Sequence, residues 1–95
     1  MNAIDLFNLG NQFLNQGKVD MAIDMWLQAT QAEPRAPEAN LSLYNMFRSQ
    51  GNLQKARDYL NRFLNSYQTA YTQEVVPKAK AELVALEEQM KQKPQ

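Results

Sequence analysis

Residues 9–29 read LGNQFLNQGKVDMAIDMWLQA, and residues 43–63 repeat the same landmarks in LYNMFRSQGNLQKARDYLNRF. When Leu9 is aligned with Leu43, identical residue types fall on one another along both stretches. The coinciding pairs include Leu9 with Leu43, Phe13 with Phe47, Gly17 with Gly51, Ala22 with Ala56, and Asp24 with Asp58. A fixed period of this kind is typical of stacked repeats, in which each unit is one supersecondary element. The sequence therefore predicts two successive copies of one helical hairpin.

The spacing of apolar residues favours helices throughout. They recur at intervals of three and four, and no segment shows the alternation typical of a strand. Glycines and prolines divide the first two-thirds of the chain into segments of about 14 residues, close to the length of an average helix. We expect these helices over residues 3–16, 19–32, 37–50 and 53–66. Gly17 and Gly51 can supply the turns, because glycine adopts conformations that a Cβ would penalise.

A fifth apolar stripe follows, formed by Val76, Ala79, Leu83, Leu86 and Met90. Pro77 suits the first turn of this helix and Thr72 is a candidate cap. We expect Lys78 and Glu82 on the side facing water, and residues 91–95 as a frayed tail. Stacked repeats usually need about three units for stability, and only two are present. We therefore expect the fifth helix to pack on the second repeat as a cap; the alternative is that it docks on another chain.

The first hairpin resembles a tetratricopeptide (TPR) repeat. The residues at the family's spacings are Leu9, Gly10, Phe13, Gly17, Ala22, Trp26, Ala29 and Pro34. The second copy is weaker, since Tyr44 stands where the family prefers a small residue and Phe63 where it prefers alanine. The resemblance implies an all-α fold, an α-α superhelix in which about five helices form a right-handed stack of antiparallel pairs. It divides the single domain of residues 1–95 into repeat 1 (3–36), repeat 2 (37–70), a C-terminal capping helix (71–92) and a tail (93–95).

The small residues of the hairpin have a physical role in this arrangement. Gly10 and Ala22 are expected where the two helices cross, because small side chains allow the backbones to approach closely. Phe13 and Trp26 are expected to fill the space beside that crossing.

Composition excludes several classes of function. The chain has 95 residues, equal numbers of acids and bases, and neither cysteine nor histidine. A protein that binds nucleic acid usually carries a basic excess, so we expect no nucleic-acid partner. Without thiol or imidazole, and without a glycine-rich phosphate loop, we expect no enzyme, no metal site and no cofactor. Because no long apolar run or secretory signal is present, we expect no membrane insertion and a cytoplasmic location.

The resemblance also implies a binding surface. In TPR proteins the first helix of each unit lines a concave groove that holds a peptide or an amphipathic helix of another protein. Residues carried over to this groove are Ile4, Phe7, Asn11, Leu14 and Asn15 from the first repeat, and Glu38, Leu41, Asn45, Arg48 and Ser49 from the second. Asparagine amides can both donate to and accept from an extended backbone. The alternative is that the fifth helix or a second subunit covers the apolar members of this set.

Two other functions stay open besides a protein-interaction adaptor. Residues 1–47 hold two bases and five acids, whereas residues 48–95 hold eight bases and five acids. A chain with unlike ends could stack head to tail as a self-associating scaffold or homo-oligomer. The other alternative is a small secretion-type chaperone that holds an amphipathic helix of a client. The subfamily of TPR domains that binds chaperone tails is disfavoured, because only Asn11 matches its binding residues.

Overall fold

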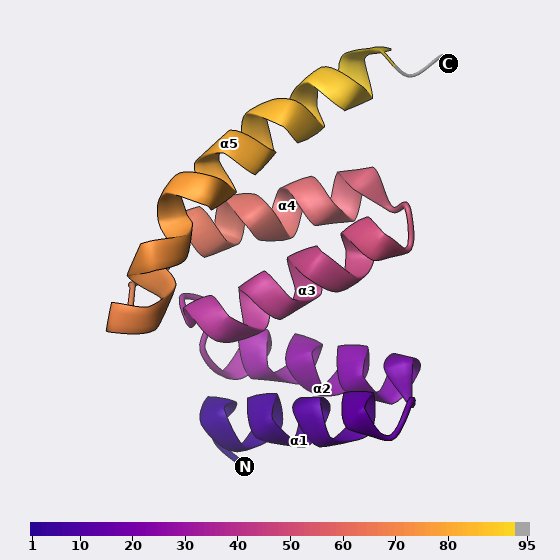
Figure 1. The fold of residues 1–95 in the computed structure, drawn as a ribbon. Helices are drawn as coiled ribbons and strands as arrows, with labels where there is room; N and C mark the ends of the chain where they lie inside the picture. The colour runs from indigo at the N-terminus through magenta and orange to yellow at the C-terminus, as the bar shows by residue number, and fades with distance from the viewer. Residues whose placement is uncertain (93–95) are drawn as a thin grey trace.

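The computed structural model describes residues 1–92, which fold into five α-helices with no strand among them (Figure 1). The helices are α1 (Ala3–Asn15), α2 (Val19–Ala32), α3 (Pro37–Ser49), α4 (Leu53–Leu64) and α5 (Ala70–Gln92). The predicted all-α fold of stacked helix pairs is therefore confirmed. The four expected helix starts agree with the structure, and α4 ends two residues earlier than expected because Asn65 and Ser66 turn the chain away. Lys91 and Gln92, expected in a frayed tail, are the last residues of α5, and the rest of the predicted tail, 93–95, lies outside the described residues.

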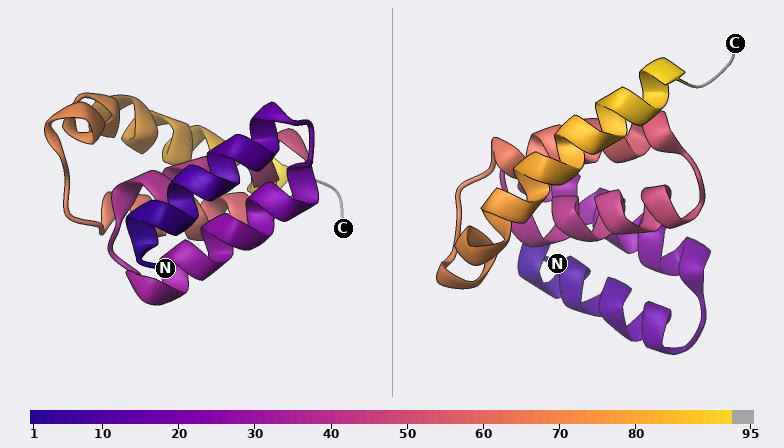
Figure 2. Two further views of the ribbon diagram at one scale, coloured as in Figure 1. Left: turned by 90° about the horizontal axis from the view of Figure 1, so that it is seen from below. Right: turned by 45° about the horizontal axis from the view of Figure 1, so that its top comes forward.

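The helices form two antiparallel hairpins that stack into an elongated body. The α1–α2 pair and the α3–α4 pair each pack along their length, α3 lies on α2, and α5 packs on α4. The body measures 41 × 28 × 20 Å, and α1 and α5 lie at its opposite ends (Figure 1). A second direction of view shows α5 crossing the second hairpin obliquely (Figure 2).

The two hairpin turns are copies of each other at the level of backbone hydrogen bonds. Gly17 and Gly51 have φ angles of 76° and 77°, the left-handed region that favours glycine. In the first turn the Lys18 N–H donates to Phe13 O at 2.9 Å and the Gly17 N–H to Leu14 O at 2.9 Å. The second turn repeats both bonds at the equivalent positions of the second hairpin, at 2.9 and 3.0 Å. Each turn is thus a Schellman motif, and the predicted glycine turns are confirmed.

The close crossing within the first hairpin depends on Gly10. A Cβ at this position would lie 2.5 Å from Trp26 Nε1 and 3.1 Å from Ala22 O. Ala22 is fully buried and Trp26 is nearly so, with its indole N–H donating to Phe7 O at 3.3 Å. The missing side chain of Gly10 therefore leaves the space that the indole ring fills.

The main core runs from the first hairpin to α5. Its fully buried members include Leu43, Leu60 and Phe63, and Ala79 and Leu86 join it from α5. Removing this apolar surface from water is the main favourable contribution to a fold of this size. Because α5 contributes buried residues to the same cluster, it is a structural part of the domain.

The beginning of α5 corrects two predictions. The helix starts at Ala70, so Pro77 lies well inside it and not in its first turn. The cap is Thr69: the Thr72 N–H donates to Thr69 Oγ1 at 3.1 Å, and the Thr69 N–H donates to Thr72 Oγ1 at 2.9 Å. This reciprocal pairing satisfies two backbone donors at the start of the helix. An interior proline removes one hydrogen bond, which the exposed position of Pro77 and the packing of α5 on α4 tolerate.

The crossing in the first hairpin predicts the effect of Ala22→Leu. The larger side chain has no free volume in the fully buried site, so we expect a loss of about 1–3 kcal/mol in the free energy of unfolding. Urea denaturation measures the loss. Ala32→Leu, at an exposed position of the same helix, is the matched control and should change stability by less than about 0.5 kcal/mol. Equal stability of the two variants would contradict the close packing of α1 against α2 at Ala22.

The packing of α5 predicts a contrast between two of its residues. Leu86 is 4% exposed and Val84 is 64% exposed, so one residue of α5 is buried in the core and the other faces solvent. Leu86→Ala should destabilise the whole domain by about 2–5 kcal/mol. Val84→Ala should stay within about 0.5 kcal/mol of the original chain. If Leu86→Ala leaves the thermal unfolding of the first four helices unchanged, α5 is not part of the cooperative core.

Candidate functional site

A partly open pocket of about 330 Å³ lies where the start of α1, the end of α2, the start of α3 and the α4–α5 linker meet. Its lining is mostly apolar, with small side chains alternating with a few large ones. The lining residues are Ala3, Ile4, Phe7, Asn8, Ala29, Ala36, Glu38, Ala39, Tyr67 and Thr69. Four alanines leave the hollow, while Ile4, Phe7 and Tyr67 supply its apolar and aromatic surface.

The wall formed by the two connecting loops is fixed by hydrogen bonds. The Tyr67 N–H donates to Arg35 O at 3.2 Å, which joins the α4–α5 linker to the α2–α3 loop. Asn40 is fully buried, and its Nδ2 donates to Ala36 O at 2.9 Å and to Pro34 O at 3.1 Å. The amide nitrogen is thus paired, whereas Asn40 Oδ1 is buried without a hydrogen-bond partner. These bonds connect and order the two loops that border the pocket.

The predicted groove residues divide into two groups. Ile4 and Phe7 line the pocket together with Glu38, and Ile4 has 70% of its surface exposed. The structure does not bring the remaining predicted residues to the pocket. Asn11 and Leu41 are half-buried, and Leu14, Asn15, Asn45 and Ser49 are exposed along the later parts of α1 and α3.

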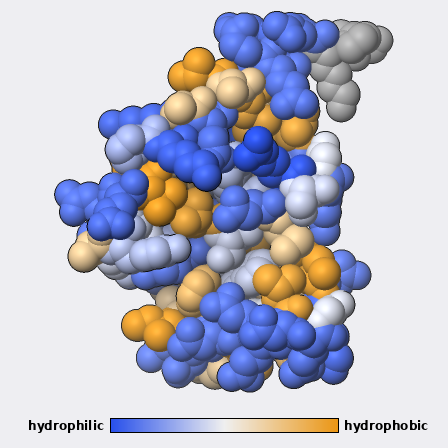
Figure 3. All heavy atoms as spheres, viewed as in Figure 1, coloured by the Kyte–Doolittle hydropathy of each residue, from blue (hydrophilic) through white to orange (hydrophobic). Residues whose placement is uncertain are grey.

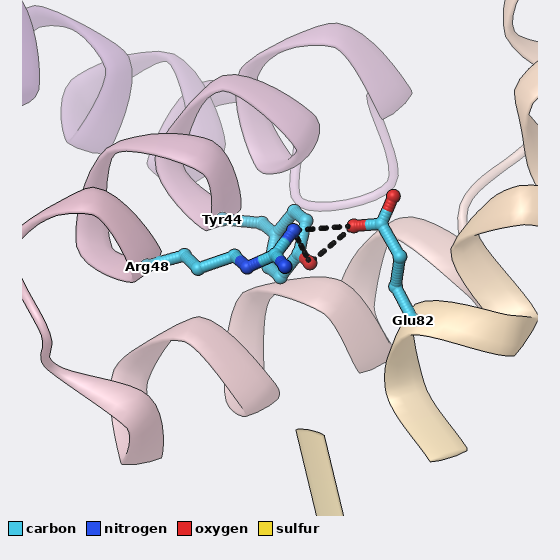
Figure 4. Close-up of polar contacts among 3 residues, drawn as sticks. All are labelled: Tyr44, Arg48 and Glu82. Atoms are coloured by element: carbon cyan, nitrogen blue, oxygen red, sulfur yellow. Dashed lines mark hydrogen bonds and ion pairs between the residues drawn. The ribbon is translucent and has the colours of Figure 1, made fainter. Parts of the chain in front are cut away.

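Arg48 has a partner from α5 (Figure 4). Its Nη1 lies 3.1 Å from Glu82 Oε2 and 3.2 Å from Tyr44 Oη, and the Tyr44 hydroxyl donates to the same Glu82 carboxylate. The prediction that Glu82 faces water is therefore wrong, because it binds α3. This end of the predicted groove is occupied by contacts of α5, and Arg48 is already ion-paired there.

The polar contact changes the acidity of the tyrosine. Tyr44 is 2% exposed, and its burial, followed by the hydrogen bond to Glu82 and the negative charge of that residue, raises its pKa to about 12. The nearby Arg48 guanidinium acts in the opposite direction. At neutral pH the phenol is thus a neutral donor that links α3 to α5.

Sequence reasoning missed most of the pocket lining. The missed residues are Ala3, Asn8, Ala29, Ala36, Ala39, Tyr67 and Thr69. Alanines carry no chemical signal, and Tyr67 and Thr69 lie in a linker whose position depends on where α5 packs. Of these residues, only Ala29 is among those that match the spacing of the TPR family. That match gives Ala29 no role at the surface.

The surface seen in Figure 3 carries several separate apolar patches divided by hydrophilic residues. Within residues 1–92 no group of acidic side chains could hold a metal ion. None of the helices formed by these residues is long and apolar enough to cross a membrane.

Neither a protein-family model nor a curated protein sequence matches the chain. A family assignment therefore rests on the internal repeat and on the contacts of the two hairpins.

The Tyr44 contact makes stability depend on pH in the alkaline range. Because folding raises the pKa of Tyr44 from 10.0 to about 12, its stabilising effect is complete below pH 10 and is lost as the pH rises toward 12. We expect the urea midpoint to fall more steeply over this range in the original chain than in Tyr44→Phe. The variant keeps the Arg48–Glu82 pair and removes only the titrating group. Parallel pH profiles would contradict the contact.

Proposed function

We propose that this chain is a protein-interaction module that binds a peptide or an amphipathic helix of another protein on the surface around the α1–α3 pocket. The observation that carries this proposal is the pocket itself, with Ile4 exposed at its lining and Phe7 half-buried beside it. A volume of about 330 Å³ lies at the lower end of the range for ligand sites. Asn8 and Tyr67 add polar groups that can bond to a peptide backbone, whereas the Thr69 hydroxyl is already bonded to Thr72.

We also propose that the chain belongs to the TPR family. Support comes from the duplicated Schellman turns and from the close crossing of Gly10 with Ala22 and Trp26. In that family the first helices of the units form the binding face, which here are α1 and α3. The residues proposed to contact a partner are Ile4, Phe7 and Glu38 at the pocket, with Asn11, Leu14, Leu41 and Asn45 beyond it.

Self-association is the second candidate, favoured by the outward-facing apolar residues of α5. Val84 is 64% exposed and Tyr71 is 72% exposed, on the helix that ends the stack. The charge asymmetry of the two halves gives this candidate little support. The helix α5 holds three bases and four acids, whereas α4 holds three bases and one acid, so the terminal helix is not the basic element. Any such assembly would rest on apolar contact.

A matched pair of substitutions tests the proposed binding face. Phe7 and Leu41 pack against the core, so glutamate there would also destabilise the fold. Ile4→Glu avoids this problem, since 70% of the Ile4 surface is exposed. Peptides selected from a random phage-displayed library on the original chain should bind Ile4→Glu at least tenfold more weakly, a change of about 1.4 kcal/mol.

Val84→Glu is the control, because it places the same charge on an equally exposed apolar residue of α5. It should leave peptide binding unchanged. Binding that survives Ile4→Glu and is lost in Val84→Glu would overturn the proposed face. Sedimentation of both variants at two concentrations tests the second candidate: an oligomer dissociated by Val84→Glu alone would favour self-association.

A further inference from the structure

We propose that the α1–α3 pocket selects peptides in which one large apolar side chain is flanked by lysine or arginine. This inference rests on the proposed function and specifies its ligand. The apolar side chain would enter the pocket between Ile4, Phe7 and Ala39, and the cation would pair with Glu38.

The dimensions of the pocket set the apolar part of this motif. The hollow of about 330 Å³ is bounded by elements from four parts of the chain, which limits how far a ligand can extend inside it. It can hold one large side chain, while a complete helix would have to lie outside. Ala29 and Ala39 are buried within the wall, so the depth of the pocket is set by residues that the core holds in place.

Glu38 sets the charge of the motif. It is half-buried in the first turn of α3 and is the one charged residue among those lining the pocket. None of the three ion pairs formed within residues 1–92 involves it. Its carboxylate therefore lies beside an apolar hollow without a cationic partner of its own. A cationic side chain of the ligand would be attracted to the Glu38 carboxylate. Because Glu38 is half-buried, salt screens this attraction less than at an open surface.

The charges next to the pocket have both signs, since Asp5 follows Ile4 in α1 and Arg35 precedes Ala36. Helices α1 and α2 contain Asp5, Asp20 and Asp24 and no lysine or arginine. Arg35 is the one base of the α2–α3 loop, and it does not line the pocket. A ligand with acidic residues beside its apolar side chain would meet repulsion from Glu38, the charged residue of the lining. The pocket thus discriminates by the sign of the flanking charge as well as by apolar contact.

A nuclear magnetic resonance titration of the full, isotope-labelled chain tests this selectivity with three synthetic peptides. The first is acetyl-Gly-Ser-Lys-Leu-Lys-Ser-Gly-amide, the second has glutamate in place of both lysines, and the third has glycine in place of leucine. We expect the first peptide to shift the backbone signals of the pocket residues and to bind at least about threefold more tightly than either of the others, as for a partly screened charge pair. Added salt should reduce the difference between the lysine and glutamate peptides.

Glu38→Gln should remove the preference for lysine over glutamate while leucine stays preferred over glycine. Glu87→Gln, on the exposed face of α5, is the matched control and should keep both preferences. Equal binding of the lysine and glutamate peptides to the original chain would overturn the charge selectivity. Shifts confined to the later residues of α1 and α3 would overturn the pocket as the anchor and leave the proposed function standing. If no peptide shifts the signals of either region, this inference is wrong. If the phage-displayed library also yields no peptide that binds the original chain, the proposed function is wrong as well.

Discussion

The crossing of α1 and α2 at Gly10 is the constraint on which the rest of the structure depends. The indole ring of Trp26 occupies the space that any side chain at position 10 would need, and its N–H is satisfied by Phe7 O. The second hairpin solves the same packing problem with the sizes exchanged. Tyr44 takes the place of Gly10 in the second repeat, and Leu60 takes the place of Trp26. Tyr44 and Leu60 are both buried in the main core.

This exchange has a consequence for α5. A large residue at position 44 carries a hydroxyl that extends beyond the hairpin, where it donates to Glu82. Arg48, one turn further along α3, pairs with the same carboxylate. The second repeat therefore holds the terminal helix through a polar contact in addition to the burial of Ala79 and Leu86. The first repeat has glycine at the corresponding position, which is buried against α2, and the pocket is lined from α1 by other residues, Ala3, Ile4, Phe7 and Asn8.

The pocket and the α5 contact divide the α1–α3 face between two tasks. Toward the start of both helices, alanines and the bonded loops leave a hollow with Ile4 and Glu38 at its lining. Toward the end of α3, the chain's own terminal helix uses the surface. A domain this short gains stability by closing one part of its face with α5, and the proposed binding surface is the other part. Residues equivalent in the repeat need not share the same surroundings: Asn11 is half-buried, whereas Asn45 is exposed.

The sequence by itself determined the helices, their order and the two glycine turns, because helical periodicity and positive φ angles are local properties that residues such as Gly17 and Gly51 carry without tertiary contacts. It also indicated the crossing of Gly10 and Ala22, because small residues at those repeat positions are what a close helix crossing needs. Only the tertiary structure decided the path of α5, the partner of Glu82 and the lining of the pocket. These features join residues far apart in the chain, such as Tyr67 with Arg35 and Tyr44 with Glu82, and no local pattern encodes which distant groups meet. The alanines line a pocket only because the surrounding elements leave space above them.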